Sequence, residues 1–199
     1  MIVWCATSNP GKLREFQAAA PDFEVRGVSI AVAPPEETGA TFEANAVSKA
    51  VYYSQWAEGP LFADDSGLEV DALRGGPGVH SARYAGPHAT AAANNALLLE
   101  RLEGVADRTA RFVCVIALVV RGRLLGAFRG AVEGRILLEP RGTGGFGYDP
   151  LFYCEALGST FGEAPLAAKM LVSHRAQALE KMFTFLRAYA ASAGSRCWS

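Results

Sequence analysis

The chain has 199 residues, of which half are hydrophobic and a fifth are charged, and its formal net charge is −1. This size fits a globular protein of one domain, with room for two lobes around a cleft and a substantial buried core. The small net charge excludes bulk attraction to nucleic acid or to an anionic membrane, so a bound anion must be held by local cations and backbone amides.

No segment predicts a membrane span or an exported protein. The longest apolar run, at 112–120, is far shorter than the roughly 20 residues of a span. The N-terminus has neither the basic region nor the cleavage site of a signal peptide. The cysteines lack the spacing of a zinc site and are interpreted as reduced, mostly structural residues of a cytoplasmic protein: Cys5, Cys114, Cys154 and Cys197.

The first part of the chain alternates between strand and helix. Residues 2–7 form a short apolar run that predicts a strand, which the turn at 8–11 ends. Residues 12–20 have helical spacing, and 25–32 predict a second strand. This alternation favours an α/β fold.

An acidic, proline-containing loop at 34–39 precedes the next helix. Thr41 is a suitable N-cap for an alanine-rich helix that continues to about residue 56. A short apolar run at 61–63 then predicts a buried strand that stops at a pair of carboxylates.

The second part of the chain contains a predicted hairpin. A glycine-rich loop at 75–78 is followed by a helix over 90–102. Two long strands, 110–120 and 124–132, are joined by the turn at 121–123. Because strands alternate with helices but include this hairpin, we expect a mixed sheet.

The chain closes with a second glycine-rich loop and a long helix. The loop covers 142–147, and the helix is predicted over 173–190. We expect one domain over 1–190 and a frayed tail over 191–199.

The carboxylates after the third predicted strand are the most informative feature. Side chains alternate along an extended chain, so Asp64 and Asp65 should point to opposite sides. Carboxylates at the end of a buried strand are where α/β proteins often place a hard divalent cation or a general base. The alternative is an Asx-turn, in which Asp65 bonds the backbone near Gly67.

The turn before the first helix is a candidate anion site. Amides at a helix N-terminus together with a lysine are typical of phosphate sites, although the spacing is not that of a Walker A loop. The alternative is an ordinary capped helix start with a solvated lysine. The segment reads Thr7, Ser8, Asn9, Pro10, Gly11 and Lys12.

The loop at 142–147 matches G-x-G-x-x-G but does not predict a dinucleotide site. That motif must open a helix, whereas Pro150 follows shortly after the last glycine. We interpret the loop as one that brings backbone, Phe146 and Asp149 against a flat ligand such as a nucleobase. A tight turn that needs glycine for positive φ is the alternative.

Three basic side chains gather near the start of the last predicted helix. With Ser173 as N-cap, His174 and Arg175 would lie in the first turn, where the helix dipole disfavours cations. Together with Lys169, they indicate an anion or polar ligand that offsets this cost. A solvent-facing His-Arg pair is the alternative.

The acidic loop contains a candidate second metal ligand. Glu37 could add an oxygen ligand to a cation held by Asp65, although exposed loop glutamates are usually only solvated. His80 and His88 lie in loops without a partner pattern and are assigned no role.

Taken in order, these segments resemble the inosine triphosphate pyrophosphatase family, also called the Ham1-like or noncanonical purine nucleoside triphosphate pyrophosphatases. The resemblance covers residue 3 to about 186. Ala44 and Ala176 depart from it, because many relatives have Glu and Gly there. The matching segments lie at 7–12, 36–39, 41–49, 63–68 (Ala63-Asp64-Asp65-Ser66-Gly67-Leu68), 77–84, 144–150 (Gly144-Gly145-Phe146-Gly147-Tyr148-Asp149-Pro150) and 169–175.

This resemblance implies an elongated, two-lobed mixed α/β fold with a central cleft, and a homodimer. It implies Mg²⁺-dependent hydrolysis of ITP, dITP and XTP to the monophosphate and pyrophosphate. Asp65 would be the catalytic acid–base residue, and Asp65 and Glu37 would bind Mg²⁺. The residues implied to bind substrate are Thr7, Ser8, Asn9, Pro10, Gly11, Lys12, Lys49 and Lys169 for the triphosphate, and Ser66, Phe146, Gly147, Tyr148, Asp149, His174 and Arg175 for the rest of the nucleotide.

Two other functions compete with this one. A Maf-like pyrophosphatase of other nucleotides shares the general fold, but the matched segments at 146–149 and 174–175 argue against it. A nucleotide sensor without turnover would not need Asp65, an acid placed to activate water.

Overall fold

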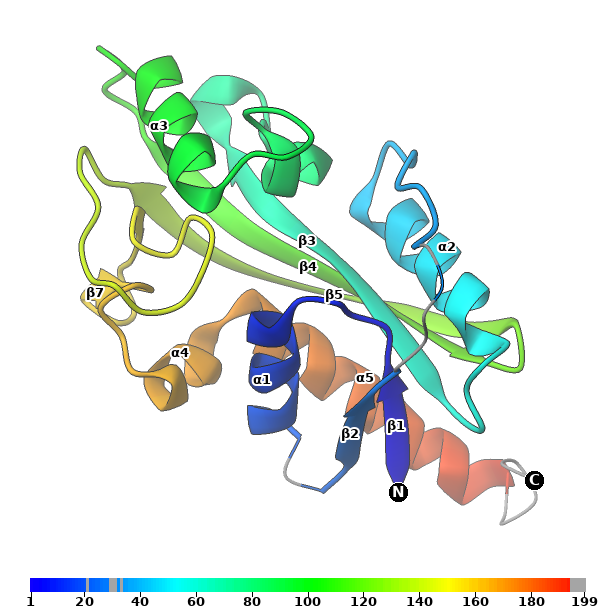
Figure 1. Ribbon diagram of the computed structural model, residues 1–199. Coiled ribbons are helices and arrows are strands. Elements are labelled where there is room, and N and C mark those ends of the chain that lie inside the picture. The colour runs from blue at the N-terminus through cyan, green and yellow to red at the C-terminus, as the bar shows by residue number, and fades with distance from the viewer. Residues whose placement is uncertain (21, 29–31, 33, 194–199) are drawn as a thin grey trace. The chain divides into compact units, whose positions relative to one another are not determined.

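The computed structural model describes residues 1–20, 22–28, 32 and 34–193 (Figure 1). Within these residues, seven strands form one sheet in the order β2-β1-β3-β4-β5-β6-β7. The strands are β1 (Ile2–Cys5), β2 (Glu24–Gly27), β3 (Leu61–Val70), β4 (Thr109–Val120), β5 (Arg123–Ile136), β6 (Phe152–Cys154) and β7 (Ser159–Thr160).

The pairing of the strands makes the sheet mixed. β1 pairs in parallel with both β2 and β3, whereas β6 pairs antiparallel with both β5 and β7. The predicted mixed α/β architecture is therefore confirmed. The helices are α1 (Pro10–Ala18), α2 (Phe42–Ser54), α3 (Ala91–Arg101), α4 (Leu166–Val172) and α5 (His174–Ala193), with short 3₁₀ turns at Asp71–Leu73 and Gly78–Arg83.

The chain divides into two compact units, each with its own core. The first unit comprises Met1–Asp65, Cys114–Gly130 and the chain from Arg175 onward, and the second comprises Ser66–Val113 and Ala131–His174. The first core includes Val3, Phe16, Phe62, Ile116 and Leu179. The second core includes Leu68, Leu98, Phe112, Phe152 and Phe161.

Local sequence explains where several elements begin and turn. Thr41 is the N-cap of α2, as predicted. Thr90, which the sequence predicts as the first residue of a helix, is the N-cap of α3, and each side-chain oxygen accepts from a backbone N–H of the first turn. Arg121 and Gly122 join β4 to β5 with φ angles of 50° and 78°. Positive φ at both central residues suits the twist of a two-residue hairpin, so the predicted hairpin is confirmed.

The third strand is longer than predicted. The prediction that it stops at 63 is wrong, because β3 continues through both aspartates to Val70. Leu68 and Val70 are fully buried in the second core, and their burial favours the extended backbone over a turn.

Other differences concern short elements. The second strand covers Glu24–Gly27, and 29–31 of its predicted range lie outside the described residues. α4, β6 and β7 have seven residues or fewer and were not predicted. Among the described helices, none combines the length and apolarity needed to cross a membrane.

Candidate active site

The turn before α1 is a capped helix start. The side-chain oxygen of Asn9 accepts from the N–H of Gly11 at 2.8 Å and of Lys12 at 3.2 Å. Pro10 occupies the start of the helix, where it lacks an N–H, and the Thr7 hydroxyl accepts from the Asn9 N–H at 3.2 Å. Two amides expected to bind an anion, those of Gly11 and Lys12, are thus already bonded to the Asn9 side chain.

Lys12 is paired with a buried carboxylate and is not simply solvated. Its Nζ lies 2.8 Å from Oδ2 of Asp64, and the two side chains are 16% and 2% exposed. Burial alone would raise the pKa of Asp64, but the cations Lys12, Lys49 and Arg175 outweigh it and hold that pKa below its ordinary value. Asp64 therefore stays ionised inside the first unit.

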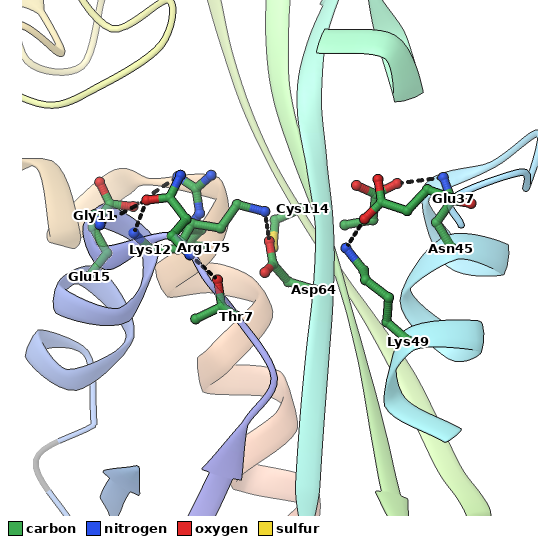
Figure 2. A network of polar contacts seen from close by, with 12 residues as sticks. Thr7, Gly11, Lys12, Glu15, Glu37, Asn45, Lys49, Asp64, Cys114 and Arg175 are labelled. Atoms are coloured by element: carbon green, nitrogen blue, oxygen red, sulfur yellow. Dashed lines mark hydrogen bonds and ion pairs between the residues drawn. The ribbon is translucent and has the colours of Figure 1, made fainter. Parts of the chain in front are cut away.

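Asp65 lies on the opposite side of β3 from Asp64. Its Oδ2 accepts from Nδ2 of Asn45 on α2 at 2.9 Å, whereas Asp64 bonds α1. Figure 2 shows Asp64 on the α1 side of the strand and Asn45 on the α2 side. The predicted alternation is confirmed, and the Asx-turn is wrong because Asp65 lies within a continuous strand.

The pKa of Asp65 is shifted in the direction opposite to that of Asp64. Burial is the largest cause and raises it, Glu37 raises it further, and Lys49 and the Asn45 hydrogen bond offset only part of this effect. Adjacent carboxylates with opposite pKa shifts can perform different tasks, one as a fixed anion and one as a proton acceptor.

Glu37 and Lys49 form a partly buried ion pair near this carboxylate. Nζ of Lys49 lies 2.6 Å from Oε1 of Glu37. Burial lowers the pKa of Lys49, but Asp64, Asp65 and Glu37 more than compensate and raise it above its ordinary value. The ammonium therefore stays charged among these carboxylates.

Arg175 is bonded to a residue that the sequence did not indicate. Its Nη1 lies 2.8 Å from Oε2 of Glu15 on α1, and both side chains are at least 94% buried. His174 is also buried, and its ring stacks on Phe112 with centroids 4.9 Å apart. The solvent-facing alternative for His174 and Arg175 is therefore wrong. For Arg175, the carboxylate of Glu15 is the anion that offsets the unfavourable position of a cation at the N-terminus of α5.

The second unit brings the loop at 142–149 to the lysine of α4. Nζ of Lys169 lies 2.6 Å from Oδ2 of Asp149, and both side chains are buried. The same carboxylate oxygen accepts from the N–H of Phe146 at 2.8 Å, and Nζ of Lys169 lies 5.4 Å from the Phe146 ring centroid. The buried ion pair thus fixes the conformation of this loop.

Position 145 of this loop requires glycine because the Asp149 carboxylate lies against it. Gly145 has a φ of 69°, and a Cβ built there would lie 2.0 Å from Oδ2 of Asp149. Tyr148 is buried, and its hydroxyl donates to the carbonyl of Ser81 at 2.9 Å. β6 is the next element after the loop, so no helix opens at Gly147 and the segment lacks the helix that a dinucleotide-binding motif requires.

The remaining predicted residues have simple environments. Ser8 and Pro10 are exposed and Ser66 is half-buried. His80 and His88 are exposed in the second unit. Cys5, Cys114 and Cys154 are buried free thiols, as expected, and Cys197 lies outside the described residues.

Sequence reasoning missed two polar residues of this site. Glu15 lies three residues after Lys12 on α1, but its partner Arg175 is 160 residues away and no local pattern connects them. Asn45 lies on the buried face of α2 with Phe42, Ala46 and Ala50. A polar residue on an otherwise apolar helix face could have indicated a buried polar contact.

Comparison with known proteins identifies the family. The model of the Ham1 family matches residues 3–185. The chain belongs to the Ham1 family.

Relatives of known name and structure are similar over most of their length. A dITP/XTP pyrophosphatase of Exiguobacterium sp. is 49% identical over 89% of this chain and 92% of that protein, and one from Geobacter sulfurreducens is 51% identical over 87% and 90%. The Ham1 protein of Staphylococcus aureus has a TM-score of 0.84 at 40% identity, covering 95% of this chain and all of that one. The Ham1 protein of Coxiella burnetii has a TM-score of 0.83 at 41% identity, covering 94% and 99%. The Ham1 fold is thus confirmed along nearly the whole chain.

Proposed function

We propose that this Ham1-family protein hydrolyses the noncanonical purine nucleoside triphosphates dITP, ITP and XTP to the monophosphate and pyrophosphate, and so removes them from the nucleotide pool. Two relatives that are 49% and 51% identical are named dITP/XTP pyrophosphatases. The observation that carries the proposal is the pair of carboxylates on β3. Asp64 is ionised and paired with Lys12. Asp65 is buried, has a raised pKa and lies near the Glu37–Lys49 pair.

Three lysines are proposed to bind the triphosphate. Lys12 and Lys49 lie on the two sides of β3, and Lys169 in the second unit adds a third ammonium. Thr7, Ser8, Asn9, Pro10 and Gly11 complete the proposed phosphate segment. The Asn9 oxygen is used in the cap, so its amide nitrogen can donate to a phosphate oxygen.

The donor set on the α2 side of β3 fits Mg²⁺. Mg²⁺ favours one or two carboxylates, completed by waters and substrate phosphates, and Asp65 and Glu37 are two such hard oxygen donors. The described residues contain no group of three His, Cys, Asp or Glu side chains that could hold a metal by themselves. When bound, Mg²⁺ would neutralise charge that develops on the departing pyrophosphate.

Asp65 is proposed to accept the proton of the attacking water. In the absence of a bound cation, burial raises the pKa of Asp65, and a higher pKa makes a carboxylate a stronger base. The hydrogen bond from Asn45 fixes one carboxylate oxygen. The carboxylate would accept the proton as water attacks the α-phosphorus and the bond from that phosphorus to the departing pyrophosphate breaks.

The base is proposed to be read by Ser66, the loop residues Phe146, Gly147, Tyr148 and Asp149, and by His174 and Arg175. Phe146 offers a ring for stacking, and the Asp149 carboxylate, fixed by Lys169 and the Phe146 N–H, offers an acceptor. Donors aimed at the 6-position pair with the oxygen of hypoxanthine or xanthine but not with the amino group of adenine.

We further propose, from the family resemblance, a cytoplasmic homodimer that binds neither nucleic acid nor membrane. Light scattering of the purified protein measures the mass in solution, and a monomer at micromolar concentration would contradict the dimer.

Pyrophosphate release from a panel of triphosphates tests the proposed function. With Mg²⁺ we expect kcat/KM for dITP, ITP and XTP to exceed that for ATP and GTP by at least about tenfold, and chelation of Mg²⁺ to abolish release. Equal rates across the panel, or full activity in chelator, would contradict it.

A further inference from the structure

Asn45 makes hydrogen bonds through both polar atoms of its side chain. It is 2% exposed, its Oδ1 accepts from the N–H of Gly39 at 2.8 Å, and its Nδ2 donates to Oδ2 of Asp65 at 2.9 Å. The orientation of the amide follows from its partners, because a backbone N–H only donates and a carboxylate only accepts.

This amide links the segments that carry the two proposed metal ligands. Gly39 lies two residues after Glu37 in the acidic loop, whereas Asp65 lies on β3. Figure 2 shows Glu37, Asn45 and Lys49 together on the α2 side of the strand. Within the first unit, the spacing between loop and strand is therefore set partly through Asn45.

Gly39 provides the clearance for this link. A Cβ built on Gly39 would lie 2.6 Å from Oδ1 of Asn45 and 2.9 Å from Cβ of Ala44. Any side chain at position 39 would push the loop away from α2 or displace the Asn45 amide. The bridge made by Asn45 therefore requires glycine at this position.

We propose that Asn45 is a positioning residue for the divalent cation, holding the Glu37 loop and the Asp65 carboxylate in the arrangement that a shared ion requires. The inference rests on the proposed function, since it concerns the metal of that same site. Mg²⁺ demands nearly ideal ligand geometry, and groups that orient ligands typically change metal affinity by about ten- to hundredfold.

The chain contains a matched control for the loss of such a bridge. Asn94 lies four residues after Thr90, the N-cap of α3, just as Asn45 lies four residues after Thr41. Asn94 is 5% exposed, accepts from the N–H of Ala85 at 2.8 Å and donates to the carbonyl of Ala82 at 3.1 Å. Asn94→Ala therefore removes a bridge of the same kind that touches no proposed metal ligand.

The experiment measures Mn²⁺ affinity directly. The loss of the free Mn²⁺ signal in electron paramagnetic resonance is followed during titration, with a non-hydrolysable α,β-imido analogue of dITP present. The proteins are wild type, Asn45→Ala, Gly39→Ala, Asn94→Ala and Asp65→Asn, and thermal unfolding is recorded for each.

We expect Asn45→Ala to weaken Mn²⁺ binding by at least about tenfold and Gly39→Ala to weaken it in the same direction. Asn94→Ala should lose thermal stability but keep Mn²⁺ affinity within about twofold. If wild type binds Mn²⁺, Asp65→Asn does not, and Asn45→Ala binds as tightly as wild type, the inference is overturned and the proposed function stands. An equal weakening in Asn94→Ala also overturns it. Failure of wild type to bind Mn²⁺, with pyrophosphate release independent of metal, overturns the proposed function itself.

Discussion

At the scale of single residues, two adjacent aspartates of one strand have opposite electrostatic environments. Asp64 points toward Lys12 and has a lowered pKa, whereas Asp65 points toward α2 and has a raised one. The alternation of β3 produces this separation, and the sequence alone was sufficient to predict it. The partners that set each pKa come from other elements and were not predictable from the strand.

This contrast predicts opposite stability changes for the two isosteric amides. A lowered pKa means that ionised Asp64 stabilises the fold above the ordinary value of 3.8, and this contribution is lost as the pH falls through the lowered pKa. A raised pKa means that ionisation of Asp65 destabilises the fold. This destabilisation is present in full above the raised pKa and is absent below the ordinary value of 3.8. Without divalent cation at neutral pH, Asp64→Asn should therefore lower the Tm and Asp65→Asn should raise it. Tm measured against pH tests this, and shifts of the same sign would contradict it.

Besides its ion pair with Asp64, Lys12 should contribute to catalysis mainly by binding the triphosphate. Lys12→Ala removes a charge-assisted contact worth about 1.5–3 kcal/mol, so we expect KM for dITP to rise about ten- to hundredfold with a smaller change in kcat. Lys181→Ala is the control, because Lys181 is an exposed lysine whose Nζ donates to the carbonyl of Arg129. Steady-state kinetics measure both, and an unchanged KM in Lys12→Ala would place the phosphates elsewhere.

At the scale of elements, one buried ion pair joins the first and last long helices of the first unit. Glu15 of α1 accepts from Arg175 at the start of α5, and α1 also carries the proposed phosphate segment. Arg175 therefore has a structural role whatever it contacts in a nucleotide.

Removal of either partner should be strongly destabilising. Glu15→Ala or Arg175→Ala leaves a buried charge unpaired, at a cost of about 3–5 kcal/mol. The double variant should cost less than the sum of the single ones, because neither charge is then left alone. Urea unfolding of the four proteins measures the coupling, and additive losses would mean that the pair contributes little.

Element prediction succeeded where periodicity and caps were strong. Thr41 and Thr90 marked the starts of α2 and α3, and Arg121-Gly122 marked the hairpin. The end of β3 was missed because Asp, Ser and Gly are typical of turns, while the tertiary burial of Leu68 and Val70 favours the strand.

At the scale of the whole molecule, the order of motifs was more informative than any single motif. Each unit has its own hydrophobic core and a lysine paired with a buried aspartate, Lys12–Asp64 in the first and Lys169–Asp149 in the second. The sequence predicted Lys12, Lys169 and Asp149 as site residues. It did not predict which residues form ion pairs, because the partners are separated by 52 and 20 positions. Long-range pairing follows from packing, which local patterns do not specify.

The central claim is that this Ham1-family protein cleaves noncanonical purine triphosphates with Asp65 as the proton acceptor. Its most direct test is the product pattern from dITP and Mg²⁺, separated by anion-exchange chromatography, for wild type and Asp65→Asn at equal folded fractions. We predict dIMP and pyrophosphate from wild type, and a rate at least about a hundredfold lower in the variant. Formation of dIDP and phosphate, or turnover by Asp65→Asn within a few-fold of wild type, would contradict it.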